Sequence, residues 1–374
     1  MDCSRSAQYM LIGISLGKTP VAKMICLVLF LSFVCGRVGL CGNAPSDLNP
    51  NKYSWCLDTK TLISEKVGEI YNHAAELVER RQDFFSNANS FYYTATKDGK
   101  IKLILVLSDH SWLRGVFDLD NRAKSIVDAA DSLTVETDGL LPAGFSSMNW
   151  EKADPKDGRE TMSSISGDFS PEQWDELKLI MKERAGVGLF GFRSMTSNFV
   201  AGTLHAESHC DNRVANTMIA PYAGNDGKLV IQFLVQNKIV HSATSFLEEA
   251  LEANLRESQA SFSRPIKELL EIYKYRKEEL AATILAVVNK RPDIGAAIDF
   301  GGGYSDSKFE ILAPQLKSII TSQNREKLLY AAVKERLAEP GTHVIAYGAL
   351  HFMGRDGIIE RLRSEGYVVE PLQQ

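Results

Sequence analysis

The sequence predicts an α/β fold whose mixed or mostly parallel central sheet is built from both ends of the chain around a large helical insertion. Apolar, β-rich runs at residues 101–107 and 133–136 flank a helical pattern and complete a β–α–β unit. A third such run, residues 342–347, lies near the carboxyl terminus. Helical patterns dominate the residues between them, about 165–330. Together these observations favour one large α/β domain over residues 61–374.

The amino-terminal elements follow one another closely. Residues 61–84 predict an amphipathic helix with its apolar side chains on one side. Residues 91–95 and 101–107 predict a hairpin, because Lys97-Asp98-Gly99-Lys100 supplies a turn with glycine at a favourable place. Residues 118–131 then predict a helix that leads into the next strand.

The middle of the chain is predicted to be mainly helical. Ser170-Pro171-Glu172-Gln173 has the pattern of a helix amino terminus, with a serine cap and a glutamine three residues later. Residues 229–234 are a strand candidate, and residues 245–288 are almost continuously helical with a break at 262–265. Gly301-Gly302-Gly303 predicts a flexible loop, which lacks the glycine spacing of a phosphate-binding loop.

The carboxyl-terminal stretch carries a histidine just after a strand. Residues 342–347 form a β-rich run that stops at Gly348, and a helix that ends at Gly366 precedes a further strand at 367–369. His351 therefore lies at the carboxyl end of a predicted parallel strand, where open α/β sheets place their ligands. A chemical role and a buried structural role are both open for it.

Composition and charge limit the partners of the chain. Its 374 residues, 44% of them hydrophobic, can bury a large core, and the net charge is −5. The sequence has no dense stripe of Lys and Arg with interleaved aromatic residues, so nucleic-acid binding has little support. The sequence does not define an oligomeric state.

Residues 1–42 are expected to be a signal peptide or a signal anchor. Residues 24–35 are an uncharged apolar run preceded by lysines, and this length suits a signal-peptide core better than a membrane span of about twenty residues. We therefore expect an exported protein that is periplasmic, secreted or attached to a membrane through this segment, with residues 43–60 as a linker. Cys56 and Cys210 lie in the body of the chain, where a disulfide and two free thiols are both open.

Several histidines need an interpretation. His205 and His209 are four residues apart, but Ala206 occupies the place of the glutamate in an HExxH zinc motif. A polar loop or cap and a metal site are therefore both open for this pair. His73, on the first predicted helix, is expected at the surface. His343 lies eight residues before His351 along an extended strand, too far to share its ligands.

A second pair of histidines is better placed for chemistry. His110 and His351 each follow a β-rich run and precede a helix, and Glu136 also ends a strand. Neutral imidazole is a common ligand of zinc, manganese and cobalt, and a carboxylate can complete such a site or act as a base. The spacing is compatible with a divalent metal held by His110 and His351, with Glu136 as a further ligand or as a base, and a structural role for these residues stays open.

The segments around these histidines resemble the TraB/PrgY/GumN family. Residues 348–372, GALHFMGRDGIIERLRSEGYVVEPL, are similar to its carboxyl-terminal signature, a GxxH followed by a short helix and a strand. Further similarity is found in its amino-terminal block at residues 100–110 and 119–138, its capped central helix at 169–181 and its Arg/Asn motif at 321–326. The resemblance spans residues 88–372, and relatives of the family include Tiki proteins and, more distantly, erythromycin esterases and ChaN-like proteins.

The resemblance implies an α/β core in which two GxxH halves face each other, with His110 and His351 as metal ligands or catalytic histidines. It implies Glu136 as their acidic partner, and Asn324 and Arg325 as residues that orient substrate or ligands. The function implied is an exported metal-dependent hydrolase of a peptide or ester bond, in which a divalent ion activates water and Arg325 stabilises negative charge.

The chain departs from the family pattern at two places. Leu107 stands where the first GxxH has its glycine, and Ala243 stands where the family often has an acid after the strand at 238–244. These departures favour an alternative function, a catalytically inactive relative that binds a ligand or regulates a process at the cell envelope.

Overall fold

The computed structural model describes residues 61, 64–86, 88–108, 121–137, 160–185, 189–206, 225–244, 261–320 and 323–372. All of them belong to one compact unit, Asp47–Gln374. The expected signal segment, His110, Cys56 and Cys210 lie outside the described residues. Among the described helices, none is long and apolar enough to cross a membrane.

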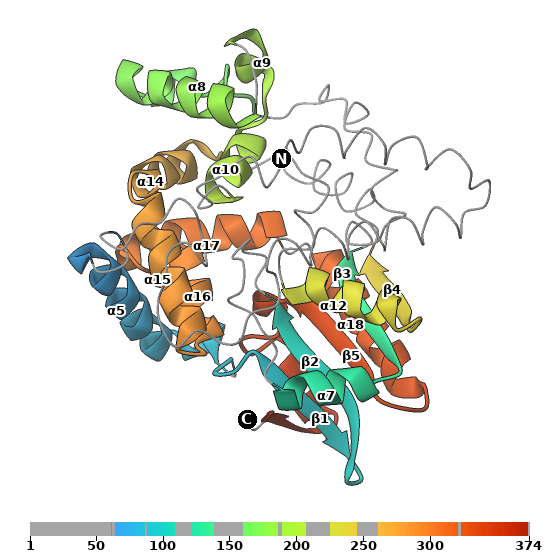
Figure 1. Cartoon of the computed structure of the whole chain (residues 1–374). Coiled ribbons are helices and arrows are strands. Elements are labelled where there is room, and N and C mark those ends of the chain that lie inside the picture. Colours follow the sequence, from blue (N-terminus) through green and yellow to red (C-terminus); the bar gives the residue numbers. More distant parts are fainter. Residues whose placement is uncertain are drawn as a thin grey trace, which may run out of the picture. The chain divides into compact units, whose positions relative to one another are not determined.

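The core of the unit is a six-stranded sheet in the order β4-β3-β5-β2-β1-β6 (Figure 1). Its strands are Tyr92–Lys97 (β1), Lys100–Ser108 (β2), Ser132–Thr137 (β3), Ile239–Thr244 (β4), His343–Gly348 (β5) and Val368–Pro371 (β6). The pairs β4–β3, β3–β5 and β5–β2 are parallel, and β1 pairs antiparallel with both β2 and β6. The predicted α/β class, with a mostly parallel sheet built from both ends of the chain, is confirmed.

The β1–β2 hairpin has the turn that the sequence predicts. Lys97 pairs with Lys100, and the two residues between them, Asp98 and Gly99, have φ angles of 53° and 72°. Positive φ at both central positions matches the right-handed twist of the flanking strands, and Asp-Gly tolerates this geometry well. The local sequence therefore fixes the register of β2, the strand that pairs with β5.

Different helices cover the two faces of the sheet, because buried side chains alternate along the strands. On β2, Leu103, Leu105 and Leu107 join one hydrophobic cluster, whereas Ile104 and Val106 join another. The first cluster includes side chains of α18 and α19, and the second includes side chains of α7 and α12. These helices span Asn121–Ala129 (α7), Asn225–Val235 (α12), Gln323–Ala338 (α18) and Ile358–Ser364 (α19).

Helix α12 corrects the strand predicted at residues 229–234. Its Leu229, Val230 and Phe233 are buried at helical spacing in the cluster that contains Leu133 and Val135 of β3. A short apolar run does not distinguish a buried strand from a buried helix by pattern alone. The region expected to be a helical insertion also contributes β4, so it is not wholly helical.

The other helices form a helical part of the same unit. They span Glu65–Arg80 (α5), Gln82–Phe85 (α6), Pro171–Ala185 (α8), Leu189–Ser194 (α9), Ser197–Ala206 (α10), Ser263–Tyr273 (α14), Arg276–Val288 (α15), Pro292–Asp299 (α16) and Asp306–Ile320 (α17). Helices α5, α15 and α16 lie side by side and pack against one another (Figure 1). Helix α16 also contacts the short 3-10 helix η7, Ala349–His351, which connects this layer to the end of β5.

Two helix starts confirm predictions from local sequence. At α8, the Gln173 amide N–H donates to Ser170 Oγ at 3.2 Å, and the Ser170 amide N–H donates to Gln173 Oε1 at 3.1 Å. These reciprocal bonds form a capping box, which satisfies two backbone donors that the helix leaves open. The break predicted at residues 262–265 coincides with the start of α14 at Ser263, which places Pro265 in the first helical turn.

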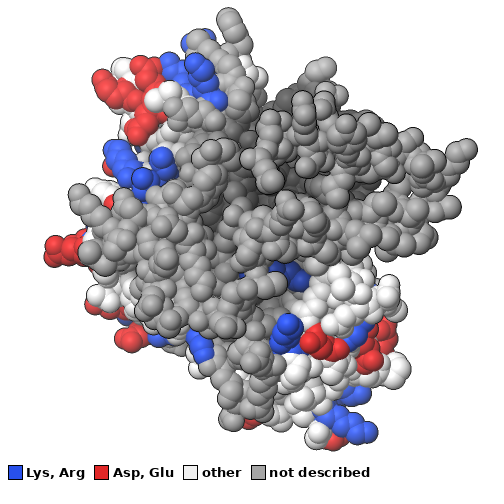
Figure 2. Space-filling model, viewed as in Figure 1, with Lys and Arg blue, Asp and Glu red and all other residues white. Residues whose placement is uncertain are grey.

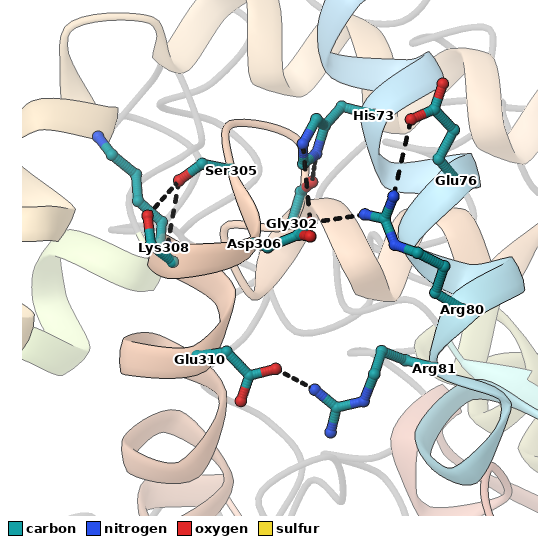
Figure 3. Close-up of polar contacts among 10 residues, drawn as sticks. His73, Glu76, Arg80, Arg81, Gly302, Ser305, Asp306, Lys308 and Glu310 are labelled. Carbon is teal, nitrogen blue, oxygen red and sulfur yellow. Dashed lines mark hydrogen bonds and ion pairs between the residues drawn. The ribbon is translucent and has the colours of Figure 1, made fainter.

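Polar contacts join α5 to the segment that leads into α17 (Figure 3). His73 Nδ1 donates to the carbonyl oxygen of Gly302 at 2.5 Å, and Arg80 Nη2 lies 2.6 Å from Oδ1 of Asp306. His73 lies at the surface only in part: 33% of its side chain is exposed, and its ring donates to a backbone carbonyl. The residues at 301–303 are buried as well, so the predicted flexible loop is a close-packed turn.

We expect Gly302→Ala to lower the free energy of unfolding by about 1–3 kcal/mol, because a core that is already close-packed resists added volume. A Cβ at this position would lie 2.8 Å from the Ala297 carbonyl oxygen and would overlap the Leu77 side chain. Gly68→Ala in α5 is the control: its Cβ would meet no atom within 4 Å. Alanine favours a helix over glycine by up to about 1 kcal/mol, so the control should stabilise. Urea unfolding measures both changes in the free energy of unfolding, and changes of the same sign for the two variants would contradict this account.

The described surface carries mixed charge. On the face shown in Figure 2, acidic and basic side chains lie interspersed around the described part of the molecule. This distribution agrees with the small net charge of −5.

Candidate functional site

Two neighbouring parallel strands bring the candidate site together. Val135 of β3 is opposite Ala346 of β5, so Glu136 and Gly348 lie near each other at the carboxyl ends of the two strands. The Gly348 amide N–H donates to Glu136 Oε2 at 2.8 Å. The Glu136 carboxylate is therefore hydrogen-bonded to the backbone at the point where β5 ends and η7 begins. This is the edge at which open α/β sheets bind ligands.

His351 is the last residue of η7 and its side chain is only 1% exposed. Its Nε2 lies 3.2 Å from Glu136 Oε1, and its Nδ1 lies 2.7 Å from Glu326 Oε1. The Tyr347 ring packs edge-on against the imidazole, with centroids 6.5 Å apart. The ring is thus held between two carboxylates and shielded from water.

Arg325 and Glu326 both come from the first turn of α18, which Gln323 begins. Arg325 Nη2 donates to Glu136 Oε1, the oxygen that also faces His351. Glu136, Arg325, Glu326 and His351 therefore form a cluster with two potential cations and two carboxylates, named here the His351 cluster. The first turn of α18 supplies one of the cations, Arg325, and one of the carboxylates, Glu326.

The charges of the His351 cluster support one another. Burial alone would lower the pKa of His351, but the negative charge and hydrogen bond of Glu136, and then those of Glu326, outweigh it. The pKa of His351 is raised from 6.5 to about 9. The imidazole therefore carries a proton on both nitrogens at neutral pH, unless another cation takes the place of one proton.

The structure brings three of the predicted site residues together, namely Glu136, Arg325 and His351. The side chain of Asn324 and the whole of His110 lie outside what the structure describes. Ser108, the last residue of β2, is opposite Gly348 of β5 in the parallel register, and His110 follows two residues later in the sequence.

Glu326 is a member of the cluster that residue-by-residue reasoning missed. A signal for it is present in the sequence, because it directly follows Arg325 in the run that resembles the family's Arg/Asn motif. The chain has many glutamates on helices, and only the three-dimensional position of α18 shows that this one reaches the His351 ring.

Two of the predicted metal ligands, His351 and Glu136, are in contact. His351 Nε2 and Glu136 Oε1 are 3.2 Å apart. Two ligands of a tetrahedral ion with bonds of about 2.0–2.1 Å are separated by roughly 3.3 Å. Glu326 sits at the opposite ring nitrogen and cannot bind the same ion as Nε2. Within the described residues, no group of three His, Cys, Asp or Glu side chains could hold a metal. A divalent ion would fit with His351 and Glu136 as two ligands and a third from outside these residues.

The remaining histidines have structural surroundings. His205 lies in the last turn of α10 with its ring stacked on Phe300, and burial lowers its pKa to about 4. His209 lies outside the described residues. His343 is buried in β5, with Nδ1 2.8 Å from Ser132 Oγ. As its position along the strand predicts, His343 is not a member of the His351 cluster.

The two departures from the family pattern also have a structural setting. Leu107 is fully buried in the core, so its side chain adds apolar contacts on β2 at the place where the family has a glycine. Ala243 is partly buried on β4, at the edge of the same hydrophobic cluster. Both residues are explained as packing positions.

A family model of the TraB/PrgY/gumN family matches residues 92–371. No curated protein and no solved structure matches the chain. The matched range contains all six strands and the four members of the His351 cluster.

Proposed function

Because the chain belongs to the TraB/PrgY/gumN family, we propose that it is a metal-dependent hydrolase that cleaves a peptide or ester bond at the His351 cluster. The proposal includes export directed by residues 1–42 and a peptide or small molecule as substrate. The metal would be zinc, manganese or cobalt, with His351, Glu136 and His110 as its ligands.

The observation that supports the proposal is the convergence of Glu136, Arg325 and His351 at the ends of two parallel strands. Glu136 is 189 positions from Arg325 and 215 positions from His351 in the sequence, yet it contacts both. Buried groups with opposing charges and a strongly shifted pKa are concentrated at functional sites. Burying these charges carries a desolvation penalty, which the contacts among the members of the cluster offset.

Each residue has a chemical role in this proposal. A bound divalent ion would polarise the scissile carbonyl and lower the pKa of a water molecule. Glu136 lies beside Nε2 of His351 and can accept a proton from a nucleophilic water. Arg325, whose guanidinium already faces Glu136, places positive charge where the oxyanion of the tetrahedral intermediate develops. Asn324 orients the substrate beside it.

We expect the purified full-length chain to bind one equivalent of zinc, manganese or cobalt, and His351→Ala to lose it. Metal content after dialysis, measured by inductively coupled plasma mass spectrometry, checks this result. His241→Ala is the control, because His241 is a partly buried histidine of β4 that has no contact with the cluster in the described part of the chain. Equal metal content in wild type and His351→Ala, with both folded by circular dichroism, would rule the proposal out.

A specific observation favours the alternative of an inactive relative. Both nitrogens of His351 face carboxylates, and Glu136 already accepts hydrogen bonds from Arg325 and the Gly348 amide. A metal must therefore displace a proton from Nε2. If wild type holds no metal at neutral pH and cleaves no peptide or ester, the cluster functions as a ligand-binding or regulatory element instead.

A further inference from the structure

We propose that Glu326 is a positioning residue, which holds the His351 ring through Nδ1 so that Nε2 is aimed at Glu136. The inference deepens the proposed function, and its metal-binding part rests on that function. Its geometric part concerns only the orientation of the ring and stands on the contacts of the described residues.

The first step is the geometry of the ring. The imidazole has two nitrogens on opposite sides, and each faces a different carboxylate: Nδ1 faces Glu326 at 2.7 Å, and Nε2 faces Glu136 at 3.2 Å. The shorter contact is the one to Glu326. A hydrogen bond of that length fixes the ring plane and keeps a proton on Nδ1, which leaves Nε2 as the nitrogen that can exchange its proton for another cation.

The second step is the support of the carboxylate itself. Glu326 lies in the first turn of α18, where the helix amides favour negative charge. Its side chain is 24% exposed, so it is largely shielded from solvent. The adjacent Arg325 reaches Glu136 from the same turn. The same helix end therefore contributes a contact on each side of the His351 ring.

The third step is the chemistry of such an arrangement. A histidine that binds a metal commonly donates its other N–H to a carboxylate, which fixes the ring orientation and raises the basicity of the ligating nitrogen. Loss of such a partner typically weakens metal binding by about 10–100-fold. If Glu326 instead served only as a negative charge at the start of α18, the effect of a substitution would depend on whether the charge is kept. The length of the side chain would not matter.

Two conservative variants separate position from charge. Glu326→Gln keeps the length of the side chain and a carbonyl acceptor but removes the charge. Glu326→Asp keeps the charge but shortens the side chain by one methylene, which moves the acceptor out of hydrogen-bond range of Nδ1. Glu335→Gln is the matched control, because Glu335 lies on the same helix with its side chain 71% exposed.

The readouts are the Nδ1–H proton of His351, observed by NMR in protein labelled with ¹⁵N-histidine, and the affinity for zinc by isothermal titration. We expect a slowly exchanging Nδ1–H signal in wild type, Glu326→Gln and the control, and its loss in Glu326→Asp. Zinc binding should weaken by about 10–100-fold in Glu326→Asp and by a smaller factor in Glu326→Gln.

The outcomes distinguish the two proposals. An unchanged Nδ1–H signal in Glu326→Asp, or its loss in Glu326→Gln alone, would overturn the positioning role. If wild type binds no zinc but Glu326→Asp still loses the Nδ1–H signal, the positioning role stands and the metal-dependent function fails. A circular dichroism spectrum equal to that of wild type shows that a variant is folded, so that a lost Nδ1–H signal reports on the ring.

Discussion

Replacement of Glu136 by alanine is expected to lower the free energy of unfolding by about 3–5 kcal/mol, the range found when one partner of a buried ion pair is removed. The Glu136 side chain is 5% exposed and contacts Arg325, His351 and the Gly348 amide. Its loss leaves two cationic groups facing each other in a site that excludes water. The midpoint and slope of a urea unfolding curve measure this effect.

Glu136→Gln tests whether charge or hydrogen bonding dominates. Glutamine has a single carbonyl oxygen, which can accept either from the Gly348 amide or from the cationic neighbours, so we expect a loss that is smaller than for alanine but not zero. Glu335→Ala on the exposed side of α18 should change stability by no more than about 0.5 kcal/mol. A loss for Glu136→Ala that is no larger than for Glu335→Ala would show that the His351 cluster does not stabilise the fold.

The parts of the fold that local rules determine could be predicted from the sequence. The Asp98-Gly99 turn and the Ser170 capping box depend on a few adjacent residues, so their patterns were sufficient. The position of His351 after a parallel strand followed from the β-rich run and the glycine that ends it. Strand ends also predicted that Glu136 would lie at the same edge of the sheet.

The errors have a common physical cause, which is tertiary packing. Residues 229–234 form part of helix α12, because apolar side chains at helical spacing meet the sheet there, and a run of this length fits either structure. Gly302 and Gly303 are close-packed because α5 and α16 approach them, and Gly301 because α14 and α17 approach it, which no local pattern reveals. Glu326 likewise reaches His351 only because α18 begins beside the end of β5.

The second large effect concerns pH. His351 has a pKa of about 9 in the folded protein against 6.5 in the unfolded chain. Because the folded pKa is raised, the protonated ring contributes stability that is fully present below about pH 6.5 and is lost as the pH rises through about 9. The buried ring is not screened by solvent, so the shift corresponds to about 3 kcal/mol at 1.36 kcal/mol per pKa unit.

We therefore expect the metal-free protein to lose about 3 kcal/mol of this contribution between about pH 6.5 and pH 9, in the presence of a chelator that leaves the proton as the only cation on Nε2. Other groups also titrate in this window, so the measured quantity is the difference in unfolding free energy between wild type and His351→Gln. Glutamine keeps a donor to one carboxylate but does not titrate, and the difference should shrink steadily toward high pH. A difference that is constant from pH 6 to pH 10 would mean that His351 is not held as a cation between Glu136 and Glu326. The same measurement with zinc added should reverse the slope if a metal replaces the proton, because metal binding to imidazole grows stronger as the competing proton is removed.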